Sequence, residues 1–287
     1  MARKRNLDHP RRRRSTRRGT ASIADAPTVP VLTGRHMFIW RLPPILTVER
    51  GVEQMADKAE AARLSGVWIK IAVGQQPYAP NLTPDFALVR DALAARGIVV
   101  WGWHEPRCAD VAAATEEARV VSDLAVELGV KGVLMDAETP QGALFFQGGK
   151  AEALAYGQLL RERLEAGGLA LGICSHDIPQ NFPAFPFDEL AQHAHVNAPQ
   201  VYYGGSPSVS NRLERAIRAN SHLTIPFVPV GAGWVGVGGG CASGSACAER
   251  GLAFIRLVKE HGFPAYSFWH WAGAPLELWA LLFEVDV

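Results

Sequence analysis

The sequence predicts an α/β fold, a single (β/α)8 TIM barrel preceded by a disordered basic N-terminal arm. Short apolar runs alternate with amphipathic helical stretches eight times after residue 36. This alternation, over about 250 residues, is the period of a (β/α)8 barrel. Polar and aromatic residues also gather where the apolar runs end, which is where such barrels carry their active sites. An open doubly wound sheet is the alternative that the same alternation allows.

The first half of the chain supplies four of the strand and helix pairs. Apolar runs predict strands at 37–40, 67–73, 98–103 and 132–138. Pro43 and Pro44 predict a loop after the first strand. The order of Thr83 and Pro84, a cap and then a proline, predicts a helix start. Helices are therefore expected at about 48–64, 84–96, 111–128 and 151–166, each followed by glycine.

The second half repeats the pattern after a proline-rich loop that contains Pro179, Pro183 and Pro186. Strands are predicted at 169–175, 196–203, 225–230 and 265–271. Helices are predicted at about 187–193, 211–219, 246–261 and 276–283. We expect two parts, a basic disordered arm over residues 1–34 and a (β/α)8 barrel over residues 35–287.

The fourth predicted strand ends in two carboxylates, Asp136 and Glu138. Side chains two apart on a strand share a face, so both acids are expected on one side, with backbones roughly 7 Å apart. One ionised carboxylate then raises the pKa of the other. An acid and a base in one site is the pattern of glycosidic bond cleavage. The alternative is that Asp136 caps the next helix and Glu138 is a solvated loop residue.

Tryptophans dominate the predicted strand ends. Six of the eight in the chain fall there, and aromatic faces stack well on the apolar faces of sugar rings. The alternative is that several of them fill the barrel or pack on helices. The tryptophans we expect to bind substrate are Trp40, Trp103, Trp269 and Trp271.

Other polar residues at the same ends complete the predicted site. Lys70 is expected to hold Asp136 ionised, which leaves the proton on Glu138. Glu105 is a third carboxylate, which His104 or His270 is expected to orient or polarise; the alternative is that these histidines are structural. Gln200 and Tyr202 share a strand face, where an amide and a phenol suit an N-acetyl group. The predicted substrate-binding residues from this group are Lys70, His104, Glu105, Gln200 and Tyr202.

A glycine-rich loop follows the seventh predicted strand at 231–240. It contains a nominal G-x-G-x-x-G, but no helix follows at once, so the pattern is a weak sign of a dinucleotide site. Loops after strands seven and eight of barrels often bind phosphate, which keeps phosphosugar chemistry open. A mobile lid fits the composition equally well. We expect no cofactor and no metal, because no Cys and His spacing resembles a zinc site.

Charge is distributed unevenly. Residues 1–20 carry nine Lys or Arg and one Asp, a local charge of +8, which leaves −7 for the rest of a chain whose total is +1. Residues 3–18 are expected to be a solvated tail or an anchor for a polyanion such as nucleic acid or an acidic wall polymer. No continuous apolar segment is long enough for a membrane span, and we expect no signal peptide. Synthesis in the cytoplasm is expected, with release by lysis or carriage in a particle left open. A disulfide between Cys241 and Cys247 and two free thiols are both compatible with the sequence.

The strand ends resemble those of family 25 glycoside hydrolases, the barrel muramidases that cut peptidoglycan. The similar segments are 67–74, 102–104, 133–138, 171–175, 200–203 and 268–271. The resemblance implies that Glu138 is the general acid and that Asp136 supports an intermediate formed by the substrate N-acetyl group. The D-x-E also resembles the end of the family 18 chitinase motif D-x-x-D-x-D-x-E, with Leu134 in place of the preceding acid.

The first strand departs from family 25, which has an aspartate at its end, whereas this chain continues with Trp40 and Arg41. Two functions therefore stay in view. One is a glycosidase that acts on an N-acetylated, peptidoglycan-like glycan. The other is a catalytically inactive barrel that serves as a glycan-binding or structural assembly module, anchored by its basic arm.

Overall fold

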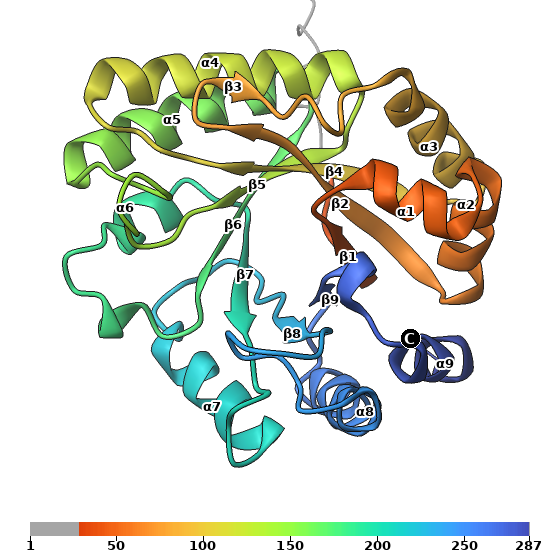
Figure 1. Ribbon diagram of the computed structural model, residues 1–287. Coiled ribbons are helices and arrows are strands. Elements are labelled where there is room, and N and C mark those ends of the chain that lie inside the picture. Colours follow the sequence, from red (N-terminus) through yellow and green to blue (C-terminus); the bar gives the residue numbers. More distant parts are fainter. Residues whose placement is uncertain (1–28, 287) are drawn as a thin grey trace, which may run out of the picture.

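The computed structural model describes residues 29–286, in which eight parallel strands form a closed barrel (Figure 1). The strands of the barrel are β1 Gly34–Ile39, β2 Leu64–Val73, β4 Val99–Glu105, β5 Gly132–Asp136, β6 Ala170–His176, β7 Val196–Val201, β8 Val230–Ala232 and β9 Ala265–Trp269. Strand β1 pairs with both β2 and β9 and so closes the sheet. The short β3 Gln76–Pro77 adds an antiparallel hairpin to β2. The predicted barrel is confirmed, and the open sheet is wrong.

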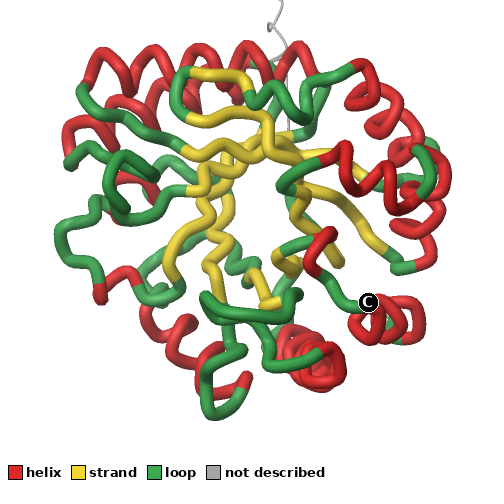
Figure 2. The backbone as a smooth tube through the Cα atoms, in the orientation of Figure 1, coloured by secondary structure: helices red, strands yellow, loops and turns green. Residues whose placement is uncertain are grey.

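The helices surround the strands, as the backbone tube shows (Figure 2). Their bounds are α1 Leu42–Glu49, α2 Val52–Ala61, α3 Pro84–Ala94, α4 Val111–Leu128, α5 Lys150–Ala166, α6 Phe187–Ala191, α7 Val209–Ala219, α8 Gly244–Glu260 and α9 Leu276–Glu284, with 3-10 turns η1 Pro179–Asn181 and η2 Trp271–Gly273. None of these helices is both long and apolar enough to cross a membrane.

The segment after β1 differs from the prediction. Pro43 and Pro44 lie in the first turn of α1, where the missing N–H of proline would have no partner within the helix. Of the helix expected at 48–64, only α2 at Val52–Ala61 forms as one continuous helix, because the chain turns at Arg50 and Gly51, with φ of 67° and 129°. Both values lie in the region that favours glycine.

The seventh strand also differs from the prediction. Instead of 225–230, regular pairing covers only β8 at Val230–Ala232, preceded by one isolated bridge at Phe227. Pro226 and Pro229 lack the N–H that a strand ladder requires, which explains the late start. Three more strands end two residues earlier than predicted, β5 at Asp136, β7 at Val201 and β9 at Trp269.

The barrel interior is a packed apolar core. Trp68, Trp101 and Trp103 are almost fully buried there, together with aliphatic side chains of the other strands. Gly132 makes this packing possible, because a Cβ atom at that position would lie 2.7 Å from the Trp101 ring. This core closes the middle of the barrel, so a ligand at the carboxyl ends of the strands binds above it.

Two predictions concern parts of the chain away from the barrel strands. The basic arm at residues 3–18 lies outside the residues that the structure describes. Cys241 and Cys247 are paired as a disulfide, with Cα atoms 5.3 Å apart, so the sequence alternative of two free thiols is not what the structure shows. Cys108 and Cys174 are buried free thiols.

Candidate active site

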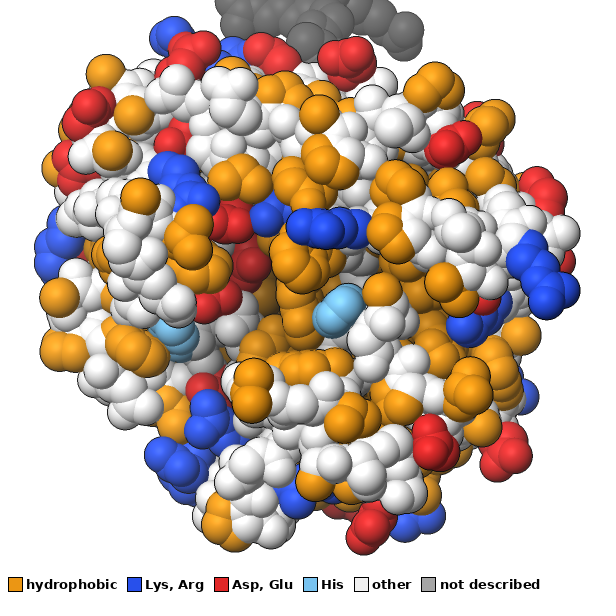
Figure 3. Space-filling view, in the orientation of Figure 1, with side chains coloured by type: hydrophobic (Ala, Val, Ile, Leu, Met, Phe, Trp, Pro, Cys, Tyr) orange, Lys and Arg blue, Asp and Glu red, His pale blue; other side chains and the backbone are white. Residues whose placement is uncertain are grey.

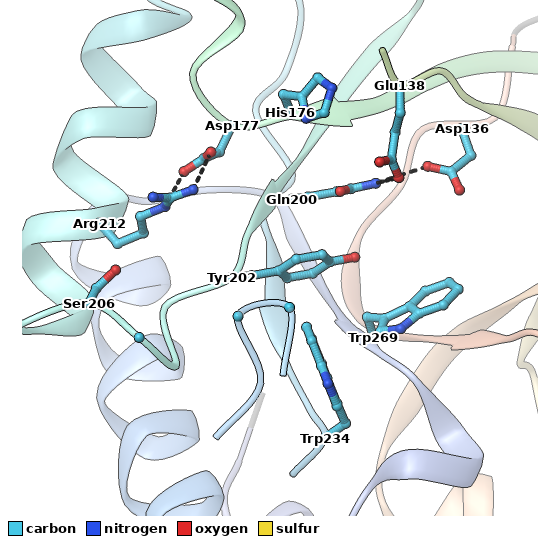
Figure 4. A pocket seen from close by; sticks show the side chains of 13 residues that line it. Asp136, Glu138, His176, Asp177, Gln200, Tyr202, Ser206, Arg212, Trp234 and Trp269 are labelled. Atoms are coloured by element: carbon cyan, nitrogen blue, oxygen red, sulfur yellow. Dashed lines mark hydrogen bonds and ion pairs between the residues drawn. The ribbon is translucent and has the colours of Figure 1, made fainter. Parts of the chain in front are cut away.

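A cavity of about 640 Å³ opens at the carboxyl ends of β5 to β9. Acidic side chains gather in the hollow at the centre of this face, with hydrophobic side chains around them (Figure 3). The residues that line the cavity are Asp136, Glu138, His176, Asp177, Gln200, Tyr202, Gly205, Ser206, Arg212, Trp234, Gly238, Gly239 and Trp269 (Figure 4). Five of the eleven predicted site residues are among them.

Asp136 and Glu138 both face this cavity, as their spacing predicts. Asp136 ends β5 and is only 6% exposed, and Glu138 follows in a half-buried loop position. The Ala137 N–H still donates to the Cys174 carbonyl at 2.9 Å, so the chain stays extended between the acids. The next helix, α5, is capped at Gly149, which rules out Asp136 as its cap.

Burial raises the pKa of both carboxyl groups. For Asp136 the desolvation is largest and the charge of Glu138 adds to it, so its pKa lies well above the ordinary range. For Glu138 burial again dominates, the charge of Glu105 adds to it, and a hydrogen bond from Gln200 opposes the rise. The two acids thus share a site in which a proton is retained at higher pH than usual.

Lys70 does not control Asp136 as predicted. Its ammonium group is 2.8 Å from Oε2 of Glu105 and 4.6 Å from the centre of the Trp103 ring. Arg107 holds the other Glu105 oxygen at 2.9 Å. The positive charge of Lys70 lowers the pKa of Asp136, but burial outweighs it. Lys70 and Glu105 therefore form a buried ion pair beside the cavity and are not among its lining residues.

Gln200 and Tyr202 come from the end of β7 and the residue after it. The Gln200 side chain donates from Nε2 to Oδ1 of Asp136 at 3.0 Å and to Oε1 of Glu138 at 2.8 Å (Figure 4). Its amide hydrogens are thus directed at the acids rather than at open space. Burial raises the pKa of Tyr202 well above its ordinary value, so its phenol stays protonated and can donate.

The aromatic wall of the cavity consists of Tyr202, Trp234 and Trp269. Tyr202 and Trp234 meet edge to face with ring centroids 4.9 Å apart, and Trp269 packs against Trp103 at 5.7 Å. Trp234 lies on the glycine-rich loop, which sequence reasoning treated as a lid or a phosphate loop. Gly239 of that loop has φ of 95° and lies so close to Tyr202 that a Cβ would be 2.7 Å from it. Here the loop forms part of the cavity wall.

The other predicted tryptophans lie elsewhere. Trp103 is 2% exposed inside the barrel, where its indole N–H donates to the Ile39 carbonyl at 3.1 Å. Trp271 packs on Trp279 of α9 and donates to Glu49 of α1. Trp40 is 41% exposed and stacks under Arg41, outside the cavity lining. The sequence could not separate these cases because all three lie at or just after the end of a predicted strand.

His104 is a structural residue. It is fully buried, and its ring nitrogens contact the Tyr156 hydroxyl at 2.8 Å and the Gly74 carbonyl at 3.0 Å. Burial lowers its pKa to about 3, which keeps the ring neutral. The predicted role in orienting Glu105 has no support, since Glu105 is held by Lys70 and Arg107.

His176, Asp177 and Arg212 line the cavity but were not among the predicted site residues. His176 and Asp177 follow the fifth predicted strand, and that position was the available signal. Arg212 lies on α7 and holds Asp177 with Nη2 at 2.6 Å and Nε at 2.5 Å (Figure 4). Nothing in the helix sequence marks Arg212, because its position at the cavity depends on how α7 packs.

Within residues 29–286, no three His, Cys, Asp or Glu side chains are grouped as metal ligands. The polar groups of the cavity include carboxyl, amide, phenol, guanidinium, imidazole and hydroxyl groups, which suit hydrogen bonding to a polyhydroxylated ligand.

Comparison with solved structures identifies the architecture. The spore cortex-lytic enzyme SleL of Bacillus cereus aligns with a TM-score of 0.60 at 11% identity, over 87% of this chain and 73% of that one. A GH18 chitinase from Pseudoalteromonas aurantia aligns with a TM-score of 0.57 at 12% identity, over 86% of this chain and 97% of that one. A D-allulose 3-epimerase from Methylomonas sp. aligns with a TM-score of 0.51 at 14% identity, over 85% of each chain.

Searches against protein-family models and against curated proteins give no match. At these identities the structural likeness shows a barrel fold shared with glycoside hydrolases. Family 18 is represented among these neighbours, which supports the second resemblance at the level of the fold; the specific assignment to family 25 is not supported.

Proposed function

We propose that this protein is a glycoside hydrolase that cleaves an N-acetylated, peptidoglycan-like glycan. The observation that carries the proposal is the pair of acids, buried Asp136 and half-buried Glu138, in a cavity walled by aromatic rings. Aromatic walls suit sugar rings, and a carboxyl group with a raised pKa suits protonation of a leaving group. The names of two structural neighbours, a spore cortex-lytic enzyme and a chitinase, agree with this class of substrate.

In the proposed reaction Glu138 is the general acid. It gives its proton to the glycosidic oxygen as the bond from that oxygen to the anomeric carbon breaks. The acetamido oxygen of the same sugar attacks the anomeric carbon, and Asp136 stabilises the positive charge that develops on the acetamido group. Water then opens the cyclic intermediate and returns a proton to Glu138.

The remaining cavity residues bind and orient the sugar in this proposal. The phenol of Tyr202 stays protonated and donates a hydrogen bond to the N-acetyl oxygen. Trp234 and Trp269 provide flat apolar surfaces for the sugar ring. Asp177 and Arg212 together offer acceptors and donors for sugar hydroxyl groups at another part of the cavity.

Release of reducing sugar from purified peptidoglycan and from chitin tests the proposal. The intact chain is expected to act on at least one polymer, and Glu138→Gln to lose about 100-fold or more of that activity. Glu127→Gln is the matched control, because Glu127 is an exposed residue of α4. Equal turnover by Glu138→Gln and the unmodified chain would refute the role of Glu138.

A binding module is the second candidate. It is favoured by one observation, that β1 ends at Ile39 and continues with Trp40 and Arg41, which places no carboxylate at this barrel position. In that case residues 35–287 bind a glycan without cleaving it, and residues 1–34 tether the barrel to a polyanion. Calorimetric binding of peptidoglycan fragments with no release of reducing sugar would favour this candidate over the hydrolase.

A further inference from the structure

Gln200 bridges the two acids of the cavity. It is 9% exposed, and its Nε2 lies 3.0 Å from Oδ1 of Asp136 and 2.8 Å from Oε1 of Glu138. A primary amide nitrogen carries two hydrogens, so each acid receives one of them. The two hydrogen bonds run to Oδ1 of Asp136 and Oε1 of Glu138, and the amide makes none to the second oxygen of either carboxyl group (Figure 4).

Neighbouring side chains offer the acids no equivalent donor. The residue before Asp136 on the same face of β5 is Leu134, which is apolar and fully buried. Lys70 is paired with Glu105 at 2.8 Å. Cys174 on β6 gives Asp136 a weaker donor, a thiol, whose hydrogen bond lowers the pKa of Asp136 and whose Sγ is also 3.8 Å from the Gln200 nitrogen. Gln200 is thus the neutral group that contacts both acids.

We infer that Gln200 is a positioning residue that keeps Oδ1 of Asp136 and Oε1 of Glu138 unprotonated, and so confines their shared proton to Oδ2 or Oε2. An oxygen that accepts a short N–H bond is a poor site for a proton of its own. The amide also fixes the rotation of both carboxyl groups. If the proposed hydrolase function holds, this arrangement presents the acid proton on a defined oxygen of Glu138.

Several other charged and titratable groups face Asp136 and Glu138 and also affect the pKa values of these two acids. Lys70 on β2 favours ionisation of Asp136, whereas Glu105 on β4 opposes ionisation of both acids. The titratable neutral groups nearby are the thiol of Cys174 on β6 and the phenol of Tyr202 after β7. A change at Gln200 leaves Lys70, Glu105 and Tyr202 in place, but it also removes the 3.8 Å contact to the Cys174 thiol.

The test is a pH titration of the side-chain carboxyl carbons by ¹³C NMR in the full chain. Glu138→Gln and Asp136→Asn assign the two signals. Gln200→Met has a similar volume but no N–H donor, and is expected to move the deprotonation of the pair upward by about one pH unit. Gln158→Met is the control, since Gln158 donates to Glu162 on the exposed surface of α5. Titration curves of Gln200→Met that superimpose on those of the unmodified chain would overturn the inference.

A second measurement needs no variant. The two Nε2 protons of Gln200 are expected to give separate, slowly exchanging signals that shift with the same midpoints as the acids. Averaged signals that ignore the acid titration would overturn the inference even if Gln200→Met fails to fold. Both readouts are independent of turnover, so they distinguish a failure of this inference from a failure of the proposed function. Where a glycan is cleaved, Gln200→Met should also move the basic limb of the kcat profile upward.

Discussion

The backbone N–H of Thr139 donates a hydrogen bond to Nε2 of His176 over 3.0 Å. The bond ties the residue after Glu138 to the end of β6, and it requires the neutral tautomer with its hydrogen on Nδ1. The ring also stacks on Phe182, with centroids 3.9 Å apart. Burial lowers the pKa of His176 to about 4. His176 therefore lines the cavity as an uncharged imidazole at neutral pH.

Protonation of His176 is expected to destabilise the folded protein in acid. The unfolded chain binds a proton at His176 near the ordinary pKa of about 6.5, whereas the folded chain resists until about 4. The stability that the folded protein gains from a neutral His176 is fully present above pH 6.5. It is lost as the pH falls toward 4, and the free energy of unfolding then drops by at most about 1.4 kcal/mol for each pH unit.

Urea unfolding at several pH values between 7 and 4 checks this prediction. His176→Gln keeps an acceptor for Thr139 without a titratable ring, and should show the shallower pH dependence. His222→Gln is the control, because His222 is an exposed residue paired with Asp188. An identical pH dependence for His176→Gln and the unmodified chain would contradict the prediction.

Glu138→Gln is expected to stabilise the fold at neutral pH while it removes activity. The folded-state pKa of Glu138 is raised, so the ionised group costs stability above the ordinary pKa of an unfolded glutamate. An isosteric amide removes that cost, and the gain should be on the order of 1 kcal/mol at pH 7. The gain should vanish below about pH 4, where the glutamate is protonated in both states.

Thermal unfolding of Glu138→Gln at pH 7 and pH 4 measures the difference. The control is again Glu127→Gln, which should leave the melting temperature unchanged at both values. A variant that melts below the unmodified chain at pH 7 would show that ionised Glu138 contributes favourably to folding.

Arg212→Ala is expected to destabilise the protein strongly. Asp177 is 4% exposed and its carboxylate is held by the Arg212 guanidinium at 2.5–2.6 Å. Removal of one member leaves a buried charge without its partner, at a cost of about 3 kcal/mol. The double variant Asp177→Asn, Arg212→Met should recover much of the loss, because no charge stays buried. A double-mutant cycle by chemical denaturation measures the coupling, and additive losses would argue against it.

Truncation of residues 1–20 tests the predicted anchor. The segment carries a local charge of +8, and binding to a polyanion through it should weaken steeply with salt. The full chain is expected to be retained on heparin or duplex DNA at low salt, and the truncated chain to lose most of that retention. A truncated chain that binds as before would place the polyanion contact elsewhere. Cleavage of a glycan should be unaffected, which separates the arm from the cavity.

Much of the fold was predictable because the signals are local. Caps, glycines and apolar periodicity identified α4 at Val111–Leu128, and the alternation of eight such units identified the barrel. The errors in the predicted boundaries arose where prolines determine the start of a helix or of strand pairing. Pro43 begins a helix instead of preventing one, and Pro226 and Pro229 delay the pairing of β8.

The sequence by itself determined that Asp136 and Glu138 share one side of the chain, because side chains alternate along a single extended strand. It also determined that this strand ends at the barrel mouth. Only the tertiary structure decided that Gln200 bridges the acids, that Arg212 reaches the cavity and that Trp103 does not. These contacts join strands and helices distant in the sequence. Their distances depend on the closure and packing of the whole barrel, which no local pattern records.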